Sequence, residues 1–143
     1  MAILCDMSTR TGQTLQQFFD AMRTRFGPQH WWPGGSPFEV IVGAVLTQNT
    51  NWTNVEKAIA RLLAAGAMDP HAIDAMDIER LAELIQPAGY FNVKSRRLKN
   101  LVRWMVQAYD GDIEAMRRVP MRAMRESLLE VNGIGPETAD SIL

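Results

Sequence analysis

The sequence has one cysteine among its 143 residues, Cys5, so neither a disulfide framework nor a cysteine-ligated metal cluster can be built from this chain. It also lacks an excess of positive charge, with 15 Lys and Arg against 16 Asp and Glu, a net charge of −1 and a pI near 6.1. Proteins that bind nucleic acid non-specifically are usually basic overall. Any contact with a phosphate backbone must therefore depend on local clusters of charge.

Long apolar runs are missing too. No stretch approaches the roughly 18 residues that a membrane span needs, and no secretory signal pattern opens the chain. Hydrophobic residues make up 47% of the sequence, which at this length suits one compact domain with its own core. We therefore expect a cytoplasmic protein.

Two stretches near the N-terminus predict helices. The first has apolar residues at helical spacing and ends at Gly27-Pro28; these residues are Leu15, Phe18, Phe19, Met22 and Phe26. The second begins with Ser36-Pro37-Phe38-Glu39, which combines a capping box with proline at the first helical position. Residues 40–46 that follow are all apolar or glycine. By length they fit a buried strand, but the capping box favours a central, fully buried helix.

The remaining start and stop signals predict helices to the end of the chain. Helix starts are expected at Thr53, with a capping box to Glu56, at Asp77, at Asn92 and after Pro120; stops are expected at Gly66, Pro87 and Gly111. No stretch alternates like a half-buried strand. The predicted fold is all-α, an orthogonal helical bundle.

The last stretch, residues 128–143, contains the most informative turn. Gly133 and Gly135 have no Cβ, so they can take positive φ and let another backbone come close. Pro136 is preorganised for the first turn of a new helix. Such a turn directs free amides and a helix N-terminus outward, which makes a site for a phosphate. The alternative is a glycine-rich turn that only packs.

This stretch resembles the helix-hairpin-helix of the DNA glycosylases related to endonuclease III. Two more blocks support the resemblance: residues 46–50, Leu-Thr-Gln-Asn-Thr, are similar to the family's segment that brings a Gln to the DNA, and residues 89–94 are similar to its Gly-aromatic-Asn-x-Lys turn. The blocks match the family in order and separation from about Trp31 to Leu143. The resemblance implies a six-helix barrel with the hairpin over 28–143, while 1–27 is the N-terminal helix of a second, mostly absent helical domain.

The resemblance also implies how DNA is bound. An enzyme that acts on a base must flip the nucleotide out of the stack, and Gln48 is expected to fill the gap; the alternative is a polar residue that satisfies backbone carbonyls at a helix end. The other implied DNA contacts are Asn49, Gly133, Ile134, Gly135, Thr138 and Lys94. Lys94 begins a basic cluster with Arg96, Arg97, Lys99 and Arg103, which either touches phosphates or is a solvated helix face.

Glu137 departs from the endonuclease III pattern. In bifunctional members this position, two after the second glycine, carries the lysine that forms a Schiff base with the sugar. A carboxylate cannot form an imine, so the lyase step is expected to be missing. The structural alternative is an acid in the first turn of a helix, where the helix dipole favours it.

A glycosylase without an amine nucleophile needs a base that departs readily, such as a cationic alkylated purine, and such cations stack well on aromatic faces. The motif formed by Trp31-Trp32-Pro33, residues 48–52 and Glu137 resembles the N3-methyladenine branch. By that resemblance Trp31 and Trp52 sandwich the base, Pro33 lines the pocket, and Glu137 contributes a carboxylate. Core packing is the alternative for each tryptophan, and we expect it for Trp32.

The family's catalytic Asp would lie beyond Leu143, so we expect a fragment of a longer enzyme that binds DNA weakly and has no turnover by itself. The leading hypothesis is a monofunctional, monomeric glycosylase that acts on damaged double-stranded DNA and removes alkylated purines. The alternatives are a bifunctional endonuclease III-type enzyme for oxidised pyrimidines and a non-catalytic helix-hairpin-helix module. No cofactor is expected within this chain. The resemblance leaves an iron–sulfur cluster in a further segment open and allows a monovalent cation at the hairpin when DNA is bound.

Overall fold

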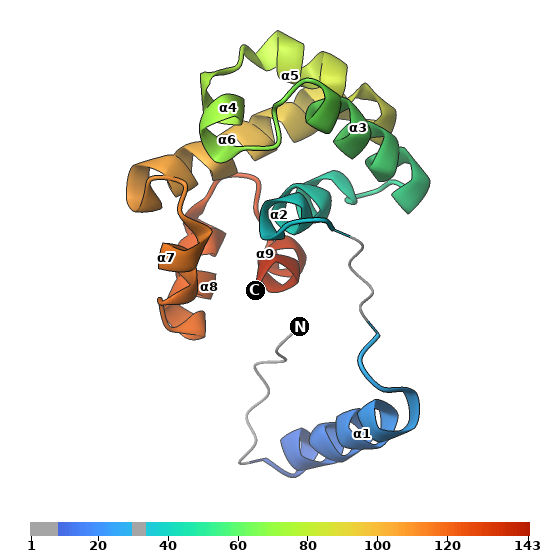
Figure 1. Cartoon of the computed structure of the whole chain (residues 1–143). Helices are drawn as coiled ribbons and strands as arrows, with labels where there is room; N and C mark the ends of the chain where they lie inside the picture. Colours follow the sequence, from blue (N-terminus) through green and yellow to red (C-terminus); the bar gives the residue numbers. More distant parts are fainter. Residues whose placement is uncertain (1–8, 30–33) are drawn as a thin grey trace. The chain divides into compact units, whose positions relative to one another are not determined.

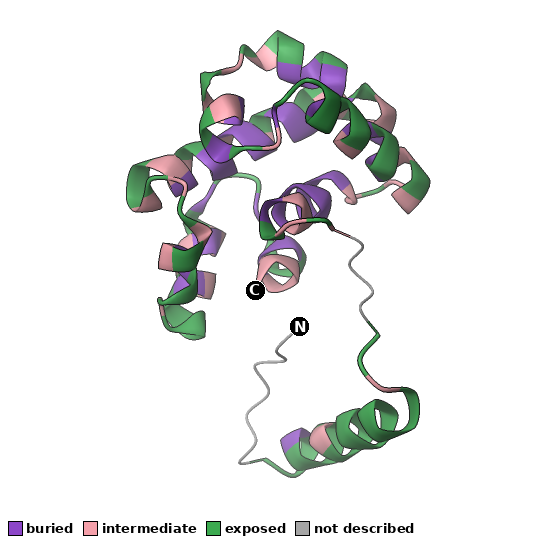
Figure 2. Cartoon of the chain, viewed as in Figure 1, coloured by how far each residue is buried: buried purple, intermediate pink, exposed green. Residues whose placement is uncertain are grey.

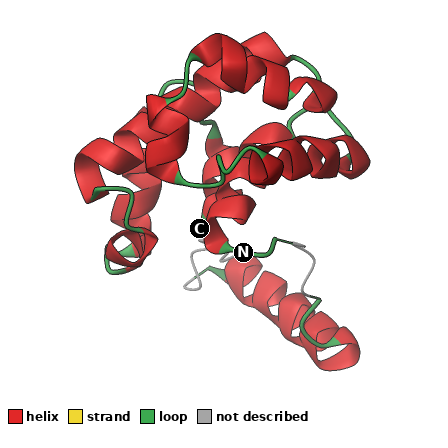
Figure 3. Cartoon of the chain, turned by 45° about the horizontal axis from the view of Figure 1, so that its top comes forward, coloured by secondary structure: helices red, strands yellow, loops and turns green. Residues whose placement is uncertain are grey.

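A computed structural model of the protein describes residues 9–29 and 34–143, and in those ranges every regular element is a helix (Figure 3). The predicted all-α fold is confirmed. None of the described helices is both long and apolar enough to cross a membrane. The chain divides into two compact units, residues 1–33 and 34–143, and each is described separately. Whether residues 1–27 belong to a second domain stays a prediction.

In the first unit, the described residues 9–29 form the helix α1 (Arg10–Phe26). Its start is capped by Thr9, whose Oγ1 accepts a hydrogen bond from the Gly12 amide at 3.0 Å, and it ends at Gly27, as predicted, with φ of 69°. The apolar stripe of this helix is largely exposed; Phe18 and Phe26 keep 63% and 65% of their surface (Figure 2). The described residues of this unit alone therefore do not bury the stripe.

The second unit is built around α2 (Pro37–Leu46), which is buried along most of its length (Figure 2). The capping signal is confirmed, because Ser36 Oγ accepts from the Glu39 amide at 3.2 Å. The Glu39 carboxylate accepts in turn from the Gly35 amide at 2.7 Å, one residue earlier than the standard box. Local start signals thus specify the helix, and its apolar composition on all sides places it at the centre.

Four short or medium elements follow α2. They are α3 (Trp52–Ala64), α4 (Pro70–Ala75), α5 (Ile78–Leu84) and the 3₁₀ turn η1 (Gln86–Ala88). The predicted cap at Thr53 is wrong: Asn51 caps α3 and accepts from the Asn54 amide at 3.0 Å. Helix α4 was not predicted, although Asp69-Pro70 carries a start signal, because six residues are too short to show periodicity.

The long helix α6 (Phe91–Tyr109) crosses the unit and packs against α2, α4 and α5 (Figure 1). The predicted cap at Asn92 is wrong, since the helix starts one residue earlier. Its N-cap is Tyr90, with φ of 45° in the left-handed region. The helix ends at Asp110 and Gly111, both with positive φ, which is the predicted stop.

Three helices complete the unit: α7 (Ile113–Arg117), α8 (Met121–Glu130) and α9 (Pro136–Ile142). Helix α7 is five residues long and was not predicted. Helices α8 and α9 contact each other, and α9 also lies beside α2 (Figure 1). The hairpin between α8 and α9 is therefore tied to the central helix of the core.

Candidate nucleic-acid interface

The hairpin between α8 and α9 exposes its glycines and buries its apolar residues. Val131 and Ile134 are 7% and 5% exposed and belong to the core, while Gly133, Gly135 and Pro136 are exposed. The Ile134 amide donates to the Val131 carbonyl at 3.0 Å, which closes the turn. The two buried side chains anchor a turn that exposes both of its glycines.

Gly133 and Gly135 differ in backbone conformation and in what surrounds them. Gly133 has φ of 96°, and a Cβ there would lie 2.5 Å from Arg97 Cγ. Gly135 is extended, with φ of −93°, and a Cβ there would meet nothing within 4 Å. Of the two glycines that could take positive φ, Gly133 does so and Gly135 does not. No described residue accepts a hydrogen bond from the Gly135 amide, so this exposed donor is available to an anion.

Two further contacts fix the hairpin. From α6, Asn100 Nδ2 donates to the Asn132 carbonyl at 3.1 Å, beside the Arg97 stem that packs on Gly133. Between α8 and α9, Arg125 Nε and Nη2 donate to the two carboxylate oxygens of Asp140 at 2.6 and 3.2 Å. This pair lowers the pKa of the Asp140 carboxyl, first through the hydrogen bond and then through the charge of the guanidinium. The turn is therefore held from both sides.

Gln48 lies in the turn that follows α2. Thr47 ends the helix and donates to the Gly43 carbonyl through its amide at 2.8 Å and its hydroxyl at 2.7 Å. Gln48 is half-buried, and Asn49 is exposed with φ of 54°. Asparagine tolerates this left-handed conformation better than most residues. The Gln48 and Asn49 positions are compatible with a contact surface, and their roles stay predictions.

The predicted basic cluster on α6 separates into two kinds of residue. Lys94 and Lys99 are 2% and 9% exposed, and both amines donate to backbone carbonyls. The prediction of a phosphate contact by Lys94 is therefore wrong, because its amine is already satisfied inside the protein. Arg96 and Arg103 are exposed and Arg97 is half-buried; Arg103 Nε lies 3.7 Å from Asp74.

Two other residues that were predicted to contact DNA, Ile134 and Thr138, are buried. Ile134 and Thr138 are both 5% exposed, and the Ile134 amide is used within the turn. Neither side chain reaches the surface, because the first faces the core from the hairpin and the second lies on the inner side of α9. Both side chains therefore support the hairpin and α9 from their buried side.

The predicted pocket residues are only partly described. Glu137 is exposed in the first turn of α9, where a carboxylate is favoured by the helix dipole. Trp52 is half-buried at the start of α3 and packs against the core. Trp31 and Pro33 lie outside the described residues. A pocket formed by these four residues therefore stays a prediction.

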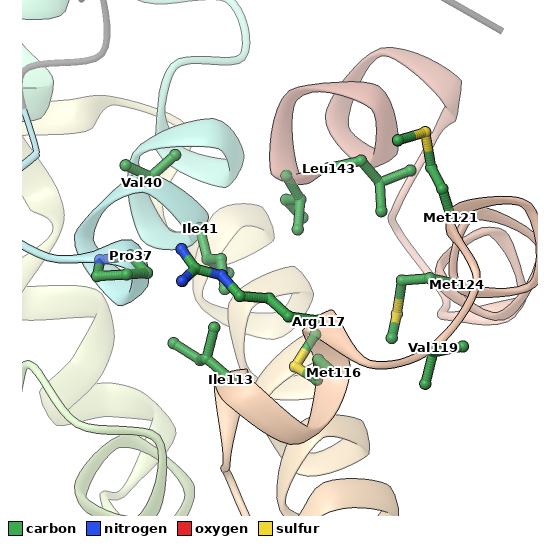
Figure 4. A pocket seen from close by; sticks show the side chains of 11 residues that line it. Pro37, Val40, Ile41, Ile113, Met116, Arg117, Val119, Met121, Met124 and Leu143 are labelled. Carbon is green, nitrogen blue, oxygen red and sulfur yellow. The ribbon is translucent and has the colours of Figure 1, made fainter. Parts of the chain in front are cut away.

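An apolar hollow of about 350 Å³ lies elsewhere, between α2, α7, α8 and the C-terminal end of α9 (Figure 4). Val40, Ile41, Met116, Met124 and Leu143 contribute to its lining, and the Arg117 side chain extends toward α2 (Figure 4). Neither Trp52 nor Glu137 borders this hollow. The two described members of the predicted base pocket therefore take no part in it.

The chain belongs to a family whose matching model is described as "HhH-GPD superfamily base excision DNA repair protein"; residues 42–136 match it. This stretch runs from the buried helix α2 to the first residue of α9, so it includes the Gln48 turn and the hairpin. The family expected from these two blocks and from the Gly-aromatic-Asn-x-Lys turn is thus confirmed.

Three relatives are similar over nearly the whole chain. Protein MJ1434 of Methanocaldococcus jannaschii, provisionally named a DNA repair glycosylase, is 41% identical over 133 residues, which are 92% of this chain and 60% of that protein. The structure of Helicobacter pylori 3-methyladenine DNA glycosylase MagIII bound to 1,N6-ethenoadenine has a TM-score of 0.72 at 31% identity, over 92% of this chain and 62% of that one. A non-covalent endonuclease III–DNA complex has a TM-score of 0.69 at 26% identity, over 91% and 57%.

The chain therefore spans about 60% of the length of the first of these relatives. The matched part contains the hairpin and the Gln48 turn. Activity, substrates and partners of the whole protein are accordingly matters for proposal.

Proposed function

We propose that this chain is the hairpin-bearing part of a monofunctional DNA glycosylase that removes alkylated purines from double-stranded DNA. The observation that carries the proposal is Glu137, which is exposed in the first turn of α9, two residues after Gly135. By the family resemblance a lyase would have an amine there, and a carboxylate cannot form an imine with the sugar. The similarity to the 3-methyladenine glycosylase MagIII supports the same substrate class.

In this proposal the hairpin binds a phosphate through exposed backbone donors, the Gly135 amide among them. Gln48 enters the space that the flipped nucleotide leaves, and Asn49 lies beside the strand. A base that carries positive charge leaves with the electron pair of its glycosidic bond and departs neutral, while water supplies the hydroxyl of the sugar and releases a proton to the solvent. Trp52, with Trp31 and Pro33, is proposed to receive the base, and Glu137 to face its charge.

A bifunctional glycosylase is the second candidate, because endonuclease III complexes, one of them a trapped covalent intermediate, share this fold at 26% identity. The experiment uses the 143-residue chain and, where the gene continues beyond residue 143, the full encoded protein. Each is incubated with a duplex containing N3-methyladenine and with one containing an oxidised pyrimidine, and borohydride is added. We expect release of the methylated base by the full protein with no covalent adduct, and no turnover by the 143-residue chain. A borohydride-trapped complex would overturn the monofunctional assignment.

We further propose that the protein is a monomer that acts on DNA in the cytoplasm, and that these 143 residues bind no cofactor. The monovalent cation at the hairpin stays a prediction. It is tested by asking whether replacing K⁺ by a large organic cation at equal ionic strength weakens binding of an undamaged duplex.

A further inference from the structure

Lys94 connects two segments that are far apart in the sequence. It lies on α6 and is 2% exposed. Its Nζ donates to the Leu46 carbonyl at 2.8 Å and to the Ala88 carbonyl at 2.7 Å. Both distances are typical of charge-assisted hydrogen bonds. A buried amine is costly unless it is paired or hydrogen-bonded, and these two carbonyls offset that cost.

The two carbonyls end two helices. Leu46 is the last residue of α2, and Ala88 is the last residue of η1. Carbonyls in the last turn of a helix have no partner within it and carry the negative end of its dipole. A positively charged donor is therefore well suited to this place. One ammonium group satisfies a helix end on each side of it.

Each of these helix ends leads into a turn with left-handed backbone. After Leu46 come Thr47, Gln48 and Asn49, with φ of 54° at Asn49; after Ala88 come Gly89 and Tyr90, with φ of 68° and 45°. Residues other than glycine are disfavoured in this region, asparagine less than tyrosine, and contacts that hold the backbone stabilise them there. The Lys94 amine holds the carbonyl three residues before Asn49 and two residues before Tyr90.

We propose that Lys94 is a positioning residue: its ammonium group fixes the turn that presents Gln48 and Asn49 against the start of α6. This inference rests on the proposed function, because that function makes the 47–49 turn part of the DNA interface. The residue itself touches no DNA. It acts by holding the Leu46 carbonyl, so that the turn keeps one conformation before DNA arrives.

The electrostatic environment of Lys94 is consistent with an amine whose role is to hold two backbone carbonyls. Burial, and then the nearby Arg97 guanidinium, lower the pKa of Lys94. Both effects oppose the charged form, and the helix-end carbonyls favour it. If this side chain only filled space, an apolar residue of similar length, such as methionine, would do so without the cost of burying an amine.

Lys99 provides a matched control on the same helix. Its amine is also buried and donates to the carbonyls of Ile73, Asp74 and Met76 at 3.1, 2.6 and 2.7 Å. Those carbonyls lie at the C-terminal end of α4, which takes no part in the proposed interface. Lys94→Met and Lys99→Met therefore remove the same group from the same kind of site, but only the first lies under the Gln48 turn.

The test measures hydrogen exchange of single amides by NMR in the 143-residue chain. The Thr50 amide, which donates to the Thr47 carbonyl at 3.2 Å, reports on the Gln48 turn; the Met76 amide, which donates to the Ile73 carbonyl at 3.2 Å, reports on the end of α4. We expect Lys94→Met to speed exchange at Thr50 about tenfold or more, as for the loss of one or two charge-assisted hydrogen bonds, with little change at Met76. Lys99→Met should do the reverse.

A second arm measures affinity for a duplex that contains an abasic-site analogue and for the same duplex undamaged. We expect Lys94→Met to lower the ratio of the two affinities roughly tenfold, since small displacements of a positioned group are costly, and Lys99→Met to leave it within about threefold. If Lys94→Met does not fold, Lys94→Gln takes its place, because its neutral amide lacks the charge of the ammonium group; it should also speed exchange at Thr50, by a smaller factor.

The possible outcomes distinguish the positioning role of Lys94 from its link to the DNA interface. Equal exchange at Thr50 in wild type and the Lys94 variant, or equal acceleration by both lysine variants, would overturn the positioning role. An unchanged affinity ratio in a Lys94 variant whose Thr50 amide does exchange faster would overturn its link to the interface. If the wild-type chain does not distinguish the two duplexes, the proposed function fails, while the exchange data still decide whether Lys94 holds the turn.

Discussion

At the scale of single residues, the hairpin glycines differ in what a side chain would meet. Gly133 combines φ of 96° with the Arg97 stem directly above it, whereas Gly135 is extended and open. Open space around an exposed glycine with an accessible amide is the arrangement that lets a ligand approach the backbone closely. One glycine thus serves the fold, and the other is available for binding.

Gly133→Ala should destabilise the chain by about 1–2 kcal/mol or more, because an L-residue at this φ is strained and its Cβ would displace Arg97. Chemical denaturation of both proteins measures the change. A variant as stable as wild type would show that the hairpin does not need this conformation.

Gly135→Ala is the complementary test. Its free energy of unfolding should stay within about 0.5 kcal/mol of wild type, as expected for a surface change that meets no neighbour. Its affinity for duplex DNA should fall severalfold, because the added methyl group obstructs approach to the Gly135 amide. Fluorescence anisotropy with a labelled duplex gives the affinity, and unchanged binding would count against a phosphate at this amide.

At the scale of elements, the ion pair between Arg125 and Asp140 links α8 to α9. The Arg125 guanidinium holds the pKa of Asp140 below its ordinary value of 3.8. The folded state therefore binds this proton less readily than the unfolded state. The pair stabilises the fold above pH 3.8, and this contribution is lost as the pH falls below 3.8 through the lower folded-state pKa.

Asp140→Asn should accordingly be less stable than wild type at pH 7, with the difference shrinking as the pH falls below 3.8. Urea denaturation across this range measures it. Glu126→Gln is the control, since Glu126 pairs with Arg122 within α8 on an exposed surface and joins no second element. A stability difference for Asp140→Asn that does not change with pH would contradict the ion-pair account.

The start of α3 offers a second prediction at this scale. Asn51→Ala should cost about 1 kcal/mol of stability, the usual effect of losing an N-cap, while Thr53→Ala should change it by no more than a few tenths. Only the Asn51 side chain accepts a hydrogen bond from a helix-start amide, that of Asn54. Thermal or urea denaturation compares the two variants, and a larger loss for Thr53→Ala would restore the capping box that the sequence suggested.

At the scale of the whole molecule, the described buried side chains of the second unit, residues 34–143, form one hydrophobic cluster that runs from Phe38 to Ala139. The first unit keeps an apolar stripe on α1 exposed among the described residues, with Phe18, Met22 and Phe26 each more than half exposed. Exposed stripes of this kind bind hydrophobic dyes and promote association.

Removing residues 1–33 should therefore leave a folded fragment whose midpoint of thermal unfolding stays close to that of the whole chain. Binding of the dye ANS should fall, because the exposed aromatic side chains of α1 are gone. Circular dichroism and dye fluorescence make the comparison. Unfolding of the 34–143 fragment would show that its core depends on the first unit.

Prediction from sequence succeeded where the determining interactions are local. The Ser36 cap, the glycine stops and the turn from Gly133 to Pro136 depend on residues a few positions apart, so their signals can be read directly. Helices α4 and α7 were missed because five or six residues give no period. The caps at Thr53 and Asn92 were each misplaced by two residues, since a side chain that could cap a helix does so only if the backbone places the right amide beside it.

The sequence by itself determined the fold class, the family and the position of the hairpin, because hydrophobic spacing and turn chemistry act over short distances. Only the tertiary structure decided which charged side chains of α6 are buried. Lys94 and Lys99 sit beside Arg96 and Arg97 in the sequence, yet the lysines are buried, while Arg96 is exposed and Arg97 half-buried. The physical reason is that one partner of Lys94, the Leu46 carbonyl, lies 48 residues away in the sequence, at a helix end. No local sequence pattern predicts such a contact.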